Sequence, residues 1–372
     1  MPSLNAKKRI TGLLSLAGIT VNGNNAWDIQ VHNDDFYQKV LAGGTLALGE
    51  TYMDKWWDCD RVDTFFTHVL TANLENVIKK NPAVIADILV TKFFNLQKRS
   101  SSFANAKHYN LDNDLFEKML DRRMIYTCAY WKDAATLDEA QENKLDLVCK
   151  KLYLQPGMHI LDIGCGWGGF AKFAAEKYGV SVTGITVSEE QLHLARKTCE
   201  GLPVEIKLVD YRDVKDKYDR IVSIGMFENV GYKNYRTYMQ VADDCLKEGG
   251  LFLFHTIGNT VTRTFPDPWL NKYIFHNYTI PSIKNIGEAI EGIFIMEDWH
   301  SFGTYYDKTL MAWHNNFVIH WEEIKDKYDE RFYRMWTYYL LLCAGSFRAK
   351  RNLLWQVVLA KKGRLETYIS VR

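Results

Sequence analysis

The fold is decided within residues 154–188, which begin LQPGMHILDIGCGWGG at 154–169 and end VTGITVS at 182–188. Residues 159–163 are a short apolar run that opens into glycines, which predicts a buried strand followed by a turn. Residues 170–178 carry Ala, Phe and Lys at helical spacing, and residues 180–187 alternate as a second strand. Together they predict a βαβ unit whose glycines let the backbone pass close to a ligand, next to the N–H donors of a helix N-terminus.

The glycine pattern, D-x-G-x-G-x-G-G at residues 162–169, leaves more than one interpretation open. A nicotinamide dinucleotide site would also need an acidic residue about 20 residues further on, at the end of the second strand. That strand ends Thr186-Val187-Ser188, and Glu189 comes only after it. The pattern more closely resembles S-adenosylmethionine-dependent methyltransferases, in which an acidic residue precedes G-x-G. An ordinary tight turn is the alternative without a ligand.

The alternation of strands and helices continues after this unit. Strands are predicted at residues 204–209, 218–224 and 251–254, with a helix at 232–246 between the last two. This order predicts an α/β fold with a parallel, doubly wound, Rossmann-like sheet. Ligands bind such sheets beyond the carboxyl ends of the strands. We therefore expect convergence of the residues that follow these strands, which are Gly164, Asp210, Glu228 and His255.

Composition limits the class of protein. The chain has 372 residues, of which 47% are hydrophobic and 24% charged, so it is long enough for one large globular domain and a smaller one. A net charge of +1 gives no sign of nucleic-acid binding. The seven cysteines form no Cys-x-x-Cys pair, which supports neither a zinc site nor a disulfide framework. No apolar run approaches the roughly 18 residues of a membrane span.

Residues 1–100 are predicted to form a small, mostly helical N-terminal domain, and residues 101–372 the large one. The lysines and arginine at 7–9 followed by an apolar run imitate a signal peptide, but a first amphipathic helix is the preferred interpretation. Further helical segments are expected at 34–57, with a break at Gly43-Gly44, at 62–74 and at 82–96. The polar residues 98–102 are the predicted linker.

Two later segments have a composition of their own. An insertion at residues 260–285 is rich in Pro and aromatic residues, so it either covers a hydrophobic substrate or packs against the other domain. Residues 331–372 contain nine Lys/Arg and one Glu. Such a surplus is usually a solvated face, but beside a lipid substrate it would suit an anionic membrane surface.

Several motifs in one order resemble cyclopropane-fatty-acyl-phospholipid synthases, nearly from end to end. They are GETYMDKWW at 49–57, YTCAYWKD at 126–133, LDIGCGWGG at 161–169, GMFENVG at 225–231, LFHTIG at 253–258 and DPWLNKYIF at 267–275. The related mycolic acid cyclopropane synthases are similar over the catalytic part but lack the N-terminal domain. The resemblance implies a class I methyltransferase sheet and transfer of a methylene from S-adenosylmethionine to a cis double bond of a phospholipid acyl chain. A bound bicarbonate ion would act as the base.

The resemblance also implies site residues. The bicarbonate would be held by Cys128, Glu228, His255, the backbone N–H of Ile257, and Tyr306. Without the resemblance, His255 would be interpreted as a core histidine, Glu228 as a cap or ion-pair carboxylate, and Cys128 as a buried thiol. The implied S-adenosylmethionine residues are Tyr126, Thr127, Gly164, Gly166, Thr186, Gln191, Asp210 and Tyr211.

The implied setting is cytoplasmic, at the inner face of a membrane, with a phospholipid bilayer as peripheral partner and a homodimer as the assembly. Two residues depart from the family pattern: Asn229 stands where a His is usual, and Asp112 replaces a small residue. Asn229 cannot titrate, which puts a proton-relay role there in doubt. The rival functions are a fatty-acyl methyltransferase that leaves a methyl branch without a ring, a non-catalytic lipid-binding protein and, more distantly, a nicotinamide oxidoreductase.

Overall fold

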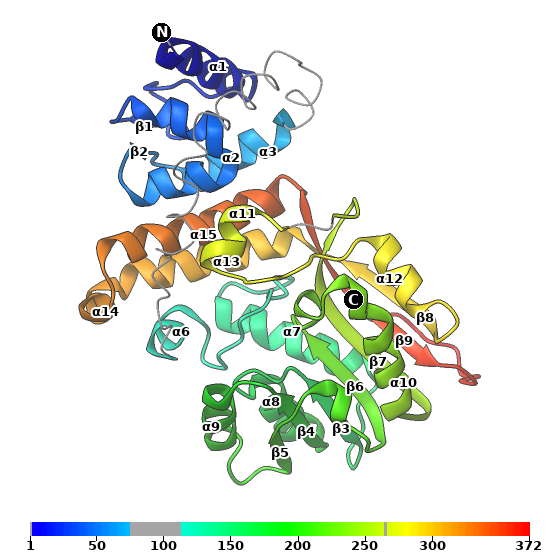
Figure 1. Ribbon diagram of the computed structural model, residues 1–372. Helices are drawn as coiled ribbons and strands as arrows, with labels where there is room; N and C mark the ends of the chain where they lie inside the picture. The colour runs from blue at the N-terminus through cyan, green and yellow to red at the C-terminus, as the bar shows by residue number, and fades with distance from the viewer. Residues whose placement is uncertain (1, 75–112, 264–265) are drawn as a thin grey trace. The chain divides into compact units, whose positions relative to one another are not determined.

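The computed structural model describes residues 2–74, 113–263 and 266–372 (Figure 1). These residues form two compact units. The helical unit comprises the described residues of Met1–Leu115 together with Pro266–Asn277 and Leu310–Arg351. The sheet unit comprises the described residues of Phe116–Phe265 together with Tyr278–Thr309 and Asn352–Arg372. The predicted boundary near residue 100, the linker at 98–102 and the helix at 82–96 lie outside the described residues, as does Asp112.

The sheet unit is built on a sheet that has seven strands among the described residues, in the order β5-β4-β3-β6-β7-β9-β8. The neighbours from β5 to β7 pair in parallel, and β9 pairs antiparallel with both β7 and β8. The strand bounds are β3 His159–Ile163, β4 Ser181–Thr186, β5 Val204–Leu208, β6 Tyr218–Ile224, β7 Leu246–Asn259, β8 Phe294–Ser301 and β9 Asn352–Lys361. The predicted doubly wound α/β sheet is confirmed.

The predicted βαβ unit is present. β3 is followed by the glycine turn and by α8 (Gly169–Tyr178), and the chain returns in β4. Gly164 and Gly168 have φ angles of 82° and 84°, which residues with a Cβ rarely adopt. The turn is therefore specified by its glycines.

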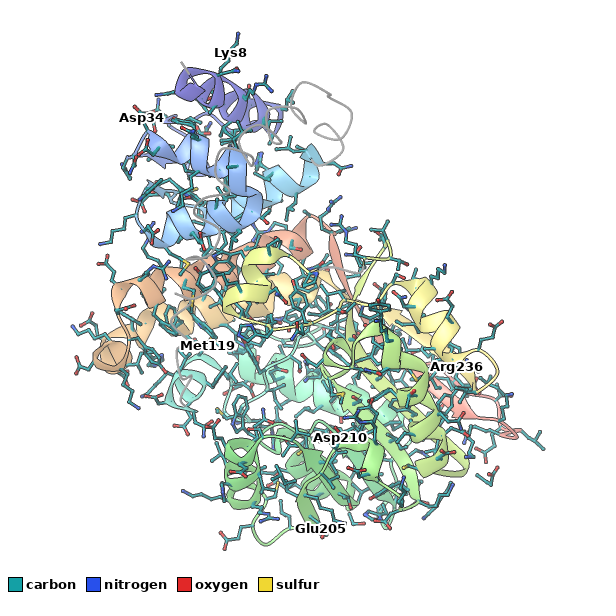
Figure 2. The ribbon with its side chains drawn as sticks, viewed as in Figure 1. Lys8, Asp34, Met119, Glu205, Asp210 and Arg236 are labelled. Carbon is teal, nitrogen blue, oxygen red and sulfur yellow. The ribbon has the colours of Figure 1, made fainter. Side chains whose placement is uncertain are left out.

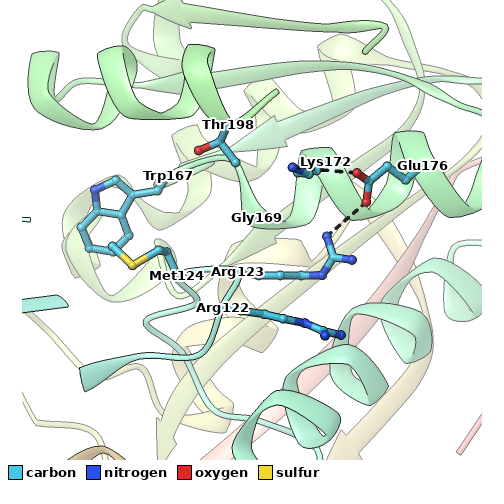
Figure 3. Close-up of a pocket in the computed structure, with 8 residues that line it drawn as sticks. All are labelled: Arg122, Arg123, Met124, Trp167, Gly169, Lys172, Glu176 and Thr198. Atoms are coloured by element: carbon cyan, nitrogen blue, oxygen red, sulfur yellow. Dashed lines mark hydrogen bonds and ion pairs between the residues drawn. The ribbon is translucent and has the colours of Figure 1, made fainter. Parts of the chain in front are cut away.

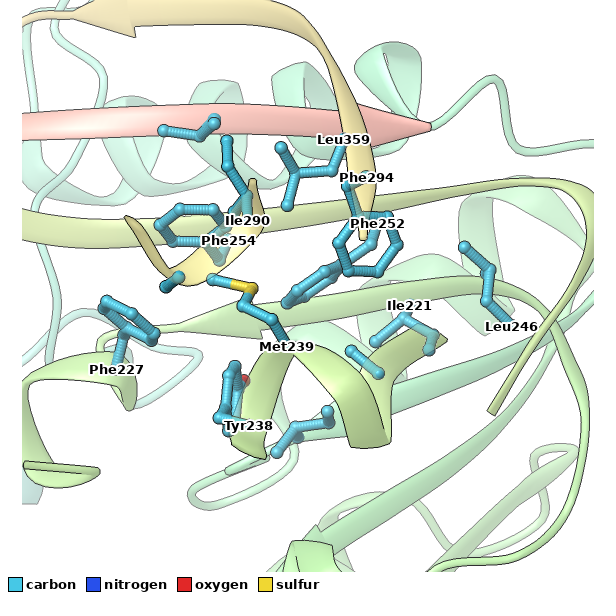
Figure 4. Packing of buried hydrophobic residues seen from close by; sticks show 14 of the residues in the cluster. Ile221, Phe227, Tyr238, Met239, Leu246, Phe252, Phe254, Ile290, Phe294 and Leu359 are labelled. Atoms are coloured by element: carbon cyan, nitrogen blue, oxygen red, sulfur yellow. The ribbon is translucent and has the colours of Figure 1, made fainter. Parts of the chain in front are cut away.

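Alternate residues of each strand enter cores on opposite faces of the sheet. Leu161, Phe252 and Phe254 pack on one face with aromatic and aliphatic residues of the helices α10 and α12 (Figure 4). Ile160 and Leu253 pack on the other face with α7 and α8. Burial on both faces explains the nearly continuous apolar runs of these strands. The helices are α7 Leu137–Lys151, α8, α9 Glu189–Thr198, α10 Tyr235–Cys245 and α12 Ile283–Ile290, with 3₁₀ turns at Tyr211–Asp213, Phe227–Asn229 and Tyr232–Asn234.

β8 and β9 were not predicted, and the fifth strand is longer than predicted. β7 continues to Asn259, so His255 lies within the strand and not after its end. The reason is β9, which pairs with β7 from Leu251 to Asn259 and satisfies the backbone of the residues beyond Phe254. His255 nevertheless pairs with Ile224, the last residue of β6, so it remains level with the edge where the parallel strands end.

The helical unit confirms the expected helices around residues 2–16, 35–53 and 62–71. In α2, Gly44 departs from helical geometry with φ 58° and ψ −137°, at the predicted glycine break. The elements of this unit are α1 Pro2–Leu16, α2 Asp35–Met53, α3 Val62–Thr71, α11 Pro268–Tyr273, α14 Trp321–Ile324, the 3₁₀ turn Lys325–Lys327, α15 Glu330–Arg348, and the two-stranded pair β1 Gln30–Val31 and β2 Trp57–Asp58. Helices α6 (Asn113–Met119) and α13 (Thr304–Ile319) contain residues of both units.

The middle of the aromatic insertion packs inside the helical unit. Trp269 on α11 is fully buried, and its ring centroid lies 4.4 Å from that of Tyr338 on α15. Lys272 forms an ion pair of 2.7 Å with Glu50 on α2. These contacts favour the second interpretation of the insertion, packing on the N-terminal segment, and its contact with lipid stays a prediction.

Most basic residues of the 331–372 segment are paired within the protein. Arg348, for example, contacts the buried Asp63 at 2.7 Å. Other ion pairs with carboxylates involve Arg331, Arg334, Lys361, Arg364 and Arg372. Within residues 2–74, 113–263 and 266–372, no helix combines the length and the hydropathy needed to cross a bilayer.

Candidate active site

The carboxyl ends of the parallel strands define the candidate site. Gly164 follows β3 directly, Thr186 ends β4, and Asp210, which is labelled in Figure 2, lies two residues after β5. Gly225 follows β6, and its N–H donates to the carbonyl of His255 on β7. The register of the parallel pairs brings these positions to one edge of the sheet. All the residues predicted for the site belong to the sheet unit.

Glu228 is held directly by the strand that carries His255. It lies on the 3₁₀ turn Phe227–Asn229, and its Oε1 accepts a hydrogen bond of 2.7 Å from the backbone N–H of Ile257. Burial raises the pKa of the Glu228 carboxyl to about 7, although the Ile257 N–H acts in the opposite direction. Of the predicted anion contacts, the Ile257 N–H thus serves to hold Glu228, and its contact with an anion stays a prediction.

His255 is buried in β7 and neutral. Burial lowers its pKa well below the ordinary value, and the positive charges of Lys144 and Lys151 lower it further. Its Nδ1 faces the side-chain amide nitrogen of Gln356 on β9 at 3.4 Å. With the Gln356 amide in this orientation its nitrogen donates, so Nδ1 accepts and the ring proton resides on Nε2. His255 can therefore donate one hydrogen bond through Nε2.

Glu228 Oε2 and His255 Nε2 are two of the buried polar atoms that have no hydrogen-bond partner among the described residues, and Asp162 Oδ2 and Gln356 Oε1 are others. Glu228 Oε2 is an acceptor and His255 Nε2 a donor, so together they suit a small ligand that carries both an O–H group and an anionic oxygen. Bicarbonate has both groups, and the residues present fit it.

The segment that carries Cys128 is hydrogen-bonded to the first turns of α13, which also carry Tyr306. Cys128 is fully buried, its thiol donates to the Ala129 carbonyl, and burial raises its pKa. The N–H of Ala129 donates to the hydroxyl of Thr309, one turn after Tyr306. Tyr306 is buried, and the neighbouring Tyr305 packs edge to face on Tyr130. Cys128 has the environment of an inert thiol, and its contact with an anion stays a prediction.

One hydrogen bond joins two of the predicted cofactor residues, and the others have neighbours of their own. Thr186 donates to Oε1 of Gln191 at 2.8 Å, which joins two of them directly. A Cβ on Gly166 would meet no described atom within 4 Å, so a ligand can approach this backbone. Asp210 is bound by two hydrogen bonds to Arg212, which lowers the pKa of its carboxyl. Tyr211 is buried beside Tyr238.

Helix α7 supports the segment that carries Tyr126 and Thr127. Gln141 donates to the carbonyls of Ile125 and Thr127, and Nζ of Lys144 donates to the Thr127 hydroxyl at 2.9 Å. Both α7 side chains are fully buried. The sequence analysis missed them, because polar residues on an amphipathic helix are expected to face solvent. Their three-residue spacing on one helix face was the available signal.

A separate pocket of about 280 Å³ opens at the N-terminus of α8 (Figure 3). Within the described part of the chain, its lining includes none of the predicted site residues. Its charges are largely paired, since Arg123 and Lys172 both contact Glu176. The lining residues are Arg122, Arg123, Met124, Trp167, Gly169, Lys172, Glu176 and Thr198.

Comparison with solved structures identifies the class. The cyclopropane synthase MmaA2 from Mycobacterium tuberculosis matches with a TM-score of 0.64 and 32% identity, over 70% of this chain and 98% of that chain. The mycolic acid cyclopropane synthase CmaA1, solved in complex with SAH and CTAB, matches with a TM-score of 0.64 and 33% identity over the same shares. The sheet, the glycine turn and these likenesses define the class I fold of S-adenosylmethionine-dependent methyltransferases.

The family follows from the sequence matches. The family model for mycolic acid cyclopropane synthetase matches residues 96–357. The cyclopropane-fatty-acyl-phospholipid synthase of Escherichia coli (strain K12) is 54% identical over 350 residues, which cover 94% of this chain and 92% of that protein. A probable fatty acid methyltransferase of Pseudomonas putida is 37% identical over 71% of this chain and 70% of its own length. The chain belongs to the mycolic acid cyclopropane synthetase family.

Proposed function

We propose that this enzyme transfers a methylene from S-adenosylmethionine to the cis double bond of an unsaturated phospholipid acyl chain and forms a cyclopropane ring. The observation that carries the proposal is the pair Glu228 and His255, whose unpartnered buried atoms Oε2 and Nε2 lie at the same sheet edge as the glycine turn. Family membership and the 54% identity to the E. coli synthase support the substrate class.

The cofactor supplies an activated methyl group on its sulfonium sulfur. An alkene is a poor nucleophile, so the protein must hold it in line with that methyl group and exclude water. Methyl transfer leaves a carbocation, which neighbouring aromatic faces stabilise. Tyr130, Phe302 and Tyr305, which pack edge to face or tilted on one another near Cys128, are suited to this task.

Ring closure needs a base that removes a proton from the new methyl group, and bicarbonate supplies this basicity when it is bound. Neutral His255 donates to it through Nε2, and Glu228 accepts its O–H through Oε2. Holding Glu228 is the task of the Ile257 N–H. The side chain of Asn229 is exposed, so this scheme routes no proton through it.

The proposed setting follows from the substrate. We propose peripheral contact with a phospholipid bilayer at the inner face of the membrane, in the cytoplasm, and a homodimer. The exposed lysines of the 331–372 segment, Lys350 and Lys362, are its candidates for contact with anionic lipid.

Product analysis tests the proposal. Vesicles of a dioleoyl phospholipid are incubated with S-adenosylmethionine and bicarbonate, and the released acyl chains are analysed by mass spectrometry and NMR. A gain of CH₂ with loss of the alkene signals supports the ring. A gain of CH₂ with a retained double bond identifies the alternative, a methyltransferase that stops before ring closure, which would match the probable fatty acid methyltransferases of Pseudomonas putida and Mycobacterium tuberculosis. Vesicle binding without turnover would indicate a lipid-binding protein.

Glu228→Gln tests the bicarbonate site. The amide cannot accept the anion's O–H through its NH₂ group, so turnover should fall by about 100-fold, the usual size of a lost acid–base contribution. SAH binding, measured by calorimetry, should change less than threefold. Added bicarbonate should restore part of the activity, and an equal loss of SAH binding and turnover would contradict the assigned role.

A further inference from the structure

Lys144 is a buried ammonium group that the proposed chemistry leaves without a task. It lies on α7 with no exposed surface, and its Nζ donates to the Thr127 hydroxyl at 2.9 Å. Asp121, Asp162, Cys128 and His255 are titratable groups close enough to interact with it electrostatically. A buried lysine is costly unless it is paired, so the presence of one at this position calls for a specific reason.

The hydrogen bond fixes the direction of the Thr127 hydroxyl. An ammonium group can only donate, so the Thr127 oxygen accepts and its own proton must point elsewhere. Thr127 is partly exposed, and its methyl group packs on Gly225, directly after β6. Its hydroxyl proton is therefore free to donate at the sheet edge, from a group already polarised by a positive charge.

Asp162 adds the opposite charge beneath the glycine turn. It is the acidic residue of the glycine motif, lies in β3 and is 2% exposed. Its Oδ2 has no hydrogen-bond partner among the described residues. Burial raises the pKa of this carboxyl to about 7, and Lys144 acts against that rise. The edge thus holds a fixed cation with an oriented O–H donor, and a buried carboxylate two residues before Gly164.

We propose that Lys144 is a positioning residue for the amino-acid end of S-adenosylmethionine: it orients the Thr127 hydroxyl to donate to the ligand carboxylate and provides the positive charge that this carboxylate needs. Asp162 complements the ligand's ammonium group. The inference deepens the proposed function, because it assumes that S-adenosylmethionine binds at this edge. It makes binding of the zwitterionic end depend on α7, which contributes no residue to the predicted site.

The test compares two ligands in calorimetric titrations. SAH carries the carboxylate and the ammonium group, whereas methylthioadenosine keeps the adenosine and the sulfur but lacks both. Lys144→Met should weaken SAH binding by about 10- to 100-fold, the range of one or two charge-assisted hydrogen bonds, and leave methylthioadenosine binding within twofold. Thr127→Val should reproduce this selective loss, and the double variant should be no weaker than Lys144→Met alone. Lys172→Met, which removes a lysine of α8 outside the site, should change neither affinity.

The outcomes separate the positioning role from a structural one. If Lys144→Met weakens both ligands in parallel, Lys144 only supports the fold and the inference is overturned. If Thr127→Val leaves the ratio of the two affinities unchanged, the inference fails even if Lys144→Met does not fold. Failure of the wild-type chain to bind either ligand would overturn the proposed function itself, whereas binding without cyclopropane formation would leave the positioning role intact.

Discussion

Burial shifts the pKa values of Glu228 and His255 in opposite directions for the same physical reason. Burial disfavours the charged form, so it raises the pKa of the acid and lowers that of the base. A neutral imidazole with its proton on Nε2 is a donor, and a carboxyl with a pKa of about 7 can accept or give a proton near physiological pH. This pair therefore suits a small anion better than two permanently charged side chains would.

The buried carboxyl of Glu228 makes stability depend on pH. Its pKa rises from 4.5 in the unfolded chain to about 7, so its cost is absent below pH 4.5 and complete above pH 7. Glu228→Gln removes this cost. Its unfolding free energy relative to wild type should therefore rise by about 2–3 kcal/mol between pH 5 and pH 8, measured by denaturant titration. A difference that does not change with pH would show that Glu228 is not buried as described.

Single residues also mark the limit of the sequence analysis. Glu228 and His255 were predicted at one edge because each follows an apolar run, and the structure brings their strands together. Lys144 and Gln356 were not found, since a lysine or a glutamine in an amphipathic segment is ordinarily exposed. Only the packed structure shows that both are fully buried.

At the scale of elements, α7 and β8 are joined by a buried ion pair. Lys151 on α7 and Asp298 on β8 lie 3.1 Å apart, with 0% and 2% of their side chains exposed. Burial lowers the pKa of Lys151 to about 8 even though Asp298 stabilises its charge. The pair therefore links a helix to a strand, and this contact was not predicted from the sequence.

Asp298→Ala would leave the Lys151 ammonium group buried without a counterion. The free energy of unfolding at pH 7 should fall by about 3–5 kcal/mol. The loss should shrink as the pH approaches 10.5, where Lys151 is uncharged in the unfolded chain as well. Lys151→Met/Asp298→Ala should recover most of the stability in the same denaturant titration. No recovery would mean that Asp298 acts mainly through its contacts with Ser370 and Arg372.

Alanine substitutions at two helix glycines should change the free energy of unfolding in opposite directions. Gly44 interrupts α2 with φ 58°, so Gly44→Ala should lower the unfolding free energy by about 1–3 kcal/mol. Gly12 is exposed within α1, and a Cβ there meets no described atom within 4 Å. Gly12→Ala should raise stability by about 0.5–1 kcal/mol. Thermal unfolding of both variants checks the contrast, which equal shifts would contradict.

Elements with strong local signals were predicted within a few residues, and those defined by distant partners were not. β3 and β6 have the predicted bounds because glycines or turn residues end their apolar runs. β8 and β9 pair across some 50 residues, and nothing local states that β9 lies between β7 and β8. The two roles proposed for the aromatic insertion could not be told apart from the sequence either, because Tyr338, against which Trp269 packs, is far away along the chain.

At the scale of the whole molecule, less of the positive charge of residues 331–372 is free to contact lipid than the sequence suggested. Six of the nine basic residues in the 331–372 segment have carboxylate partners, which leaves a small part of the surplus for other contacts. Binding to anionic vesicles should still strengthen at low salt, but with a modest slope, since few free charges take part.

Lys350→Glu/Lys362→Glu should reduce binding to anionic vesicles by about 30-fold or more at low salt, because each lysine near such a surface contributes about 1 kcal/mol. The control Lys177→Glu/Lys197→Glu makes the same charge change on exposed residues of α8 and α9 and should have a smaller effect. Sedimentation with vesicles at two salt concentrations measures both. Binding that does not depend on salt would remove this segment from the proposed membrane contact.

The place of β9 has a consequence for biosynthesis. This strand, drawn in red in Figure 1, pairs with β7 and β8 on its two sides, and seven of its ten residues are buried. During translation, the strand bearing His255 is made about a hundred residues before its neighbour, and it keeps an apolar, unpaired edge until then. Residue 361 must therefore be synthesised before β7 and β8 can both pair with β9. A chain that stalls earlier exposes these unpaired strands and should need chaperones.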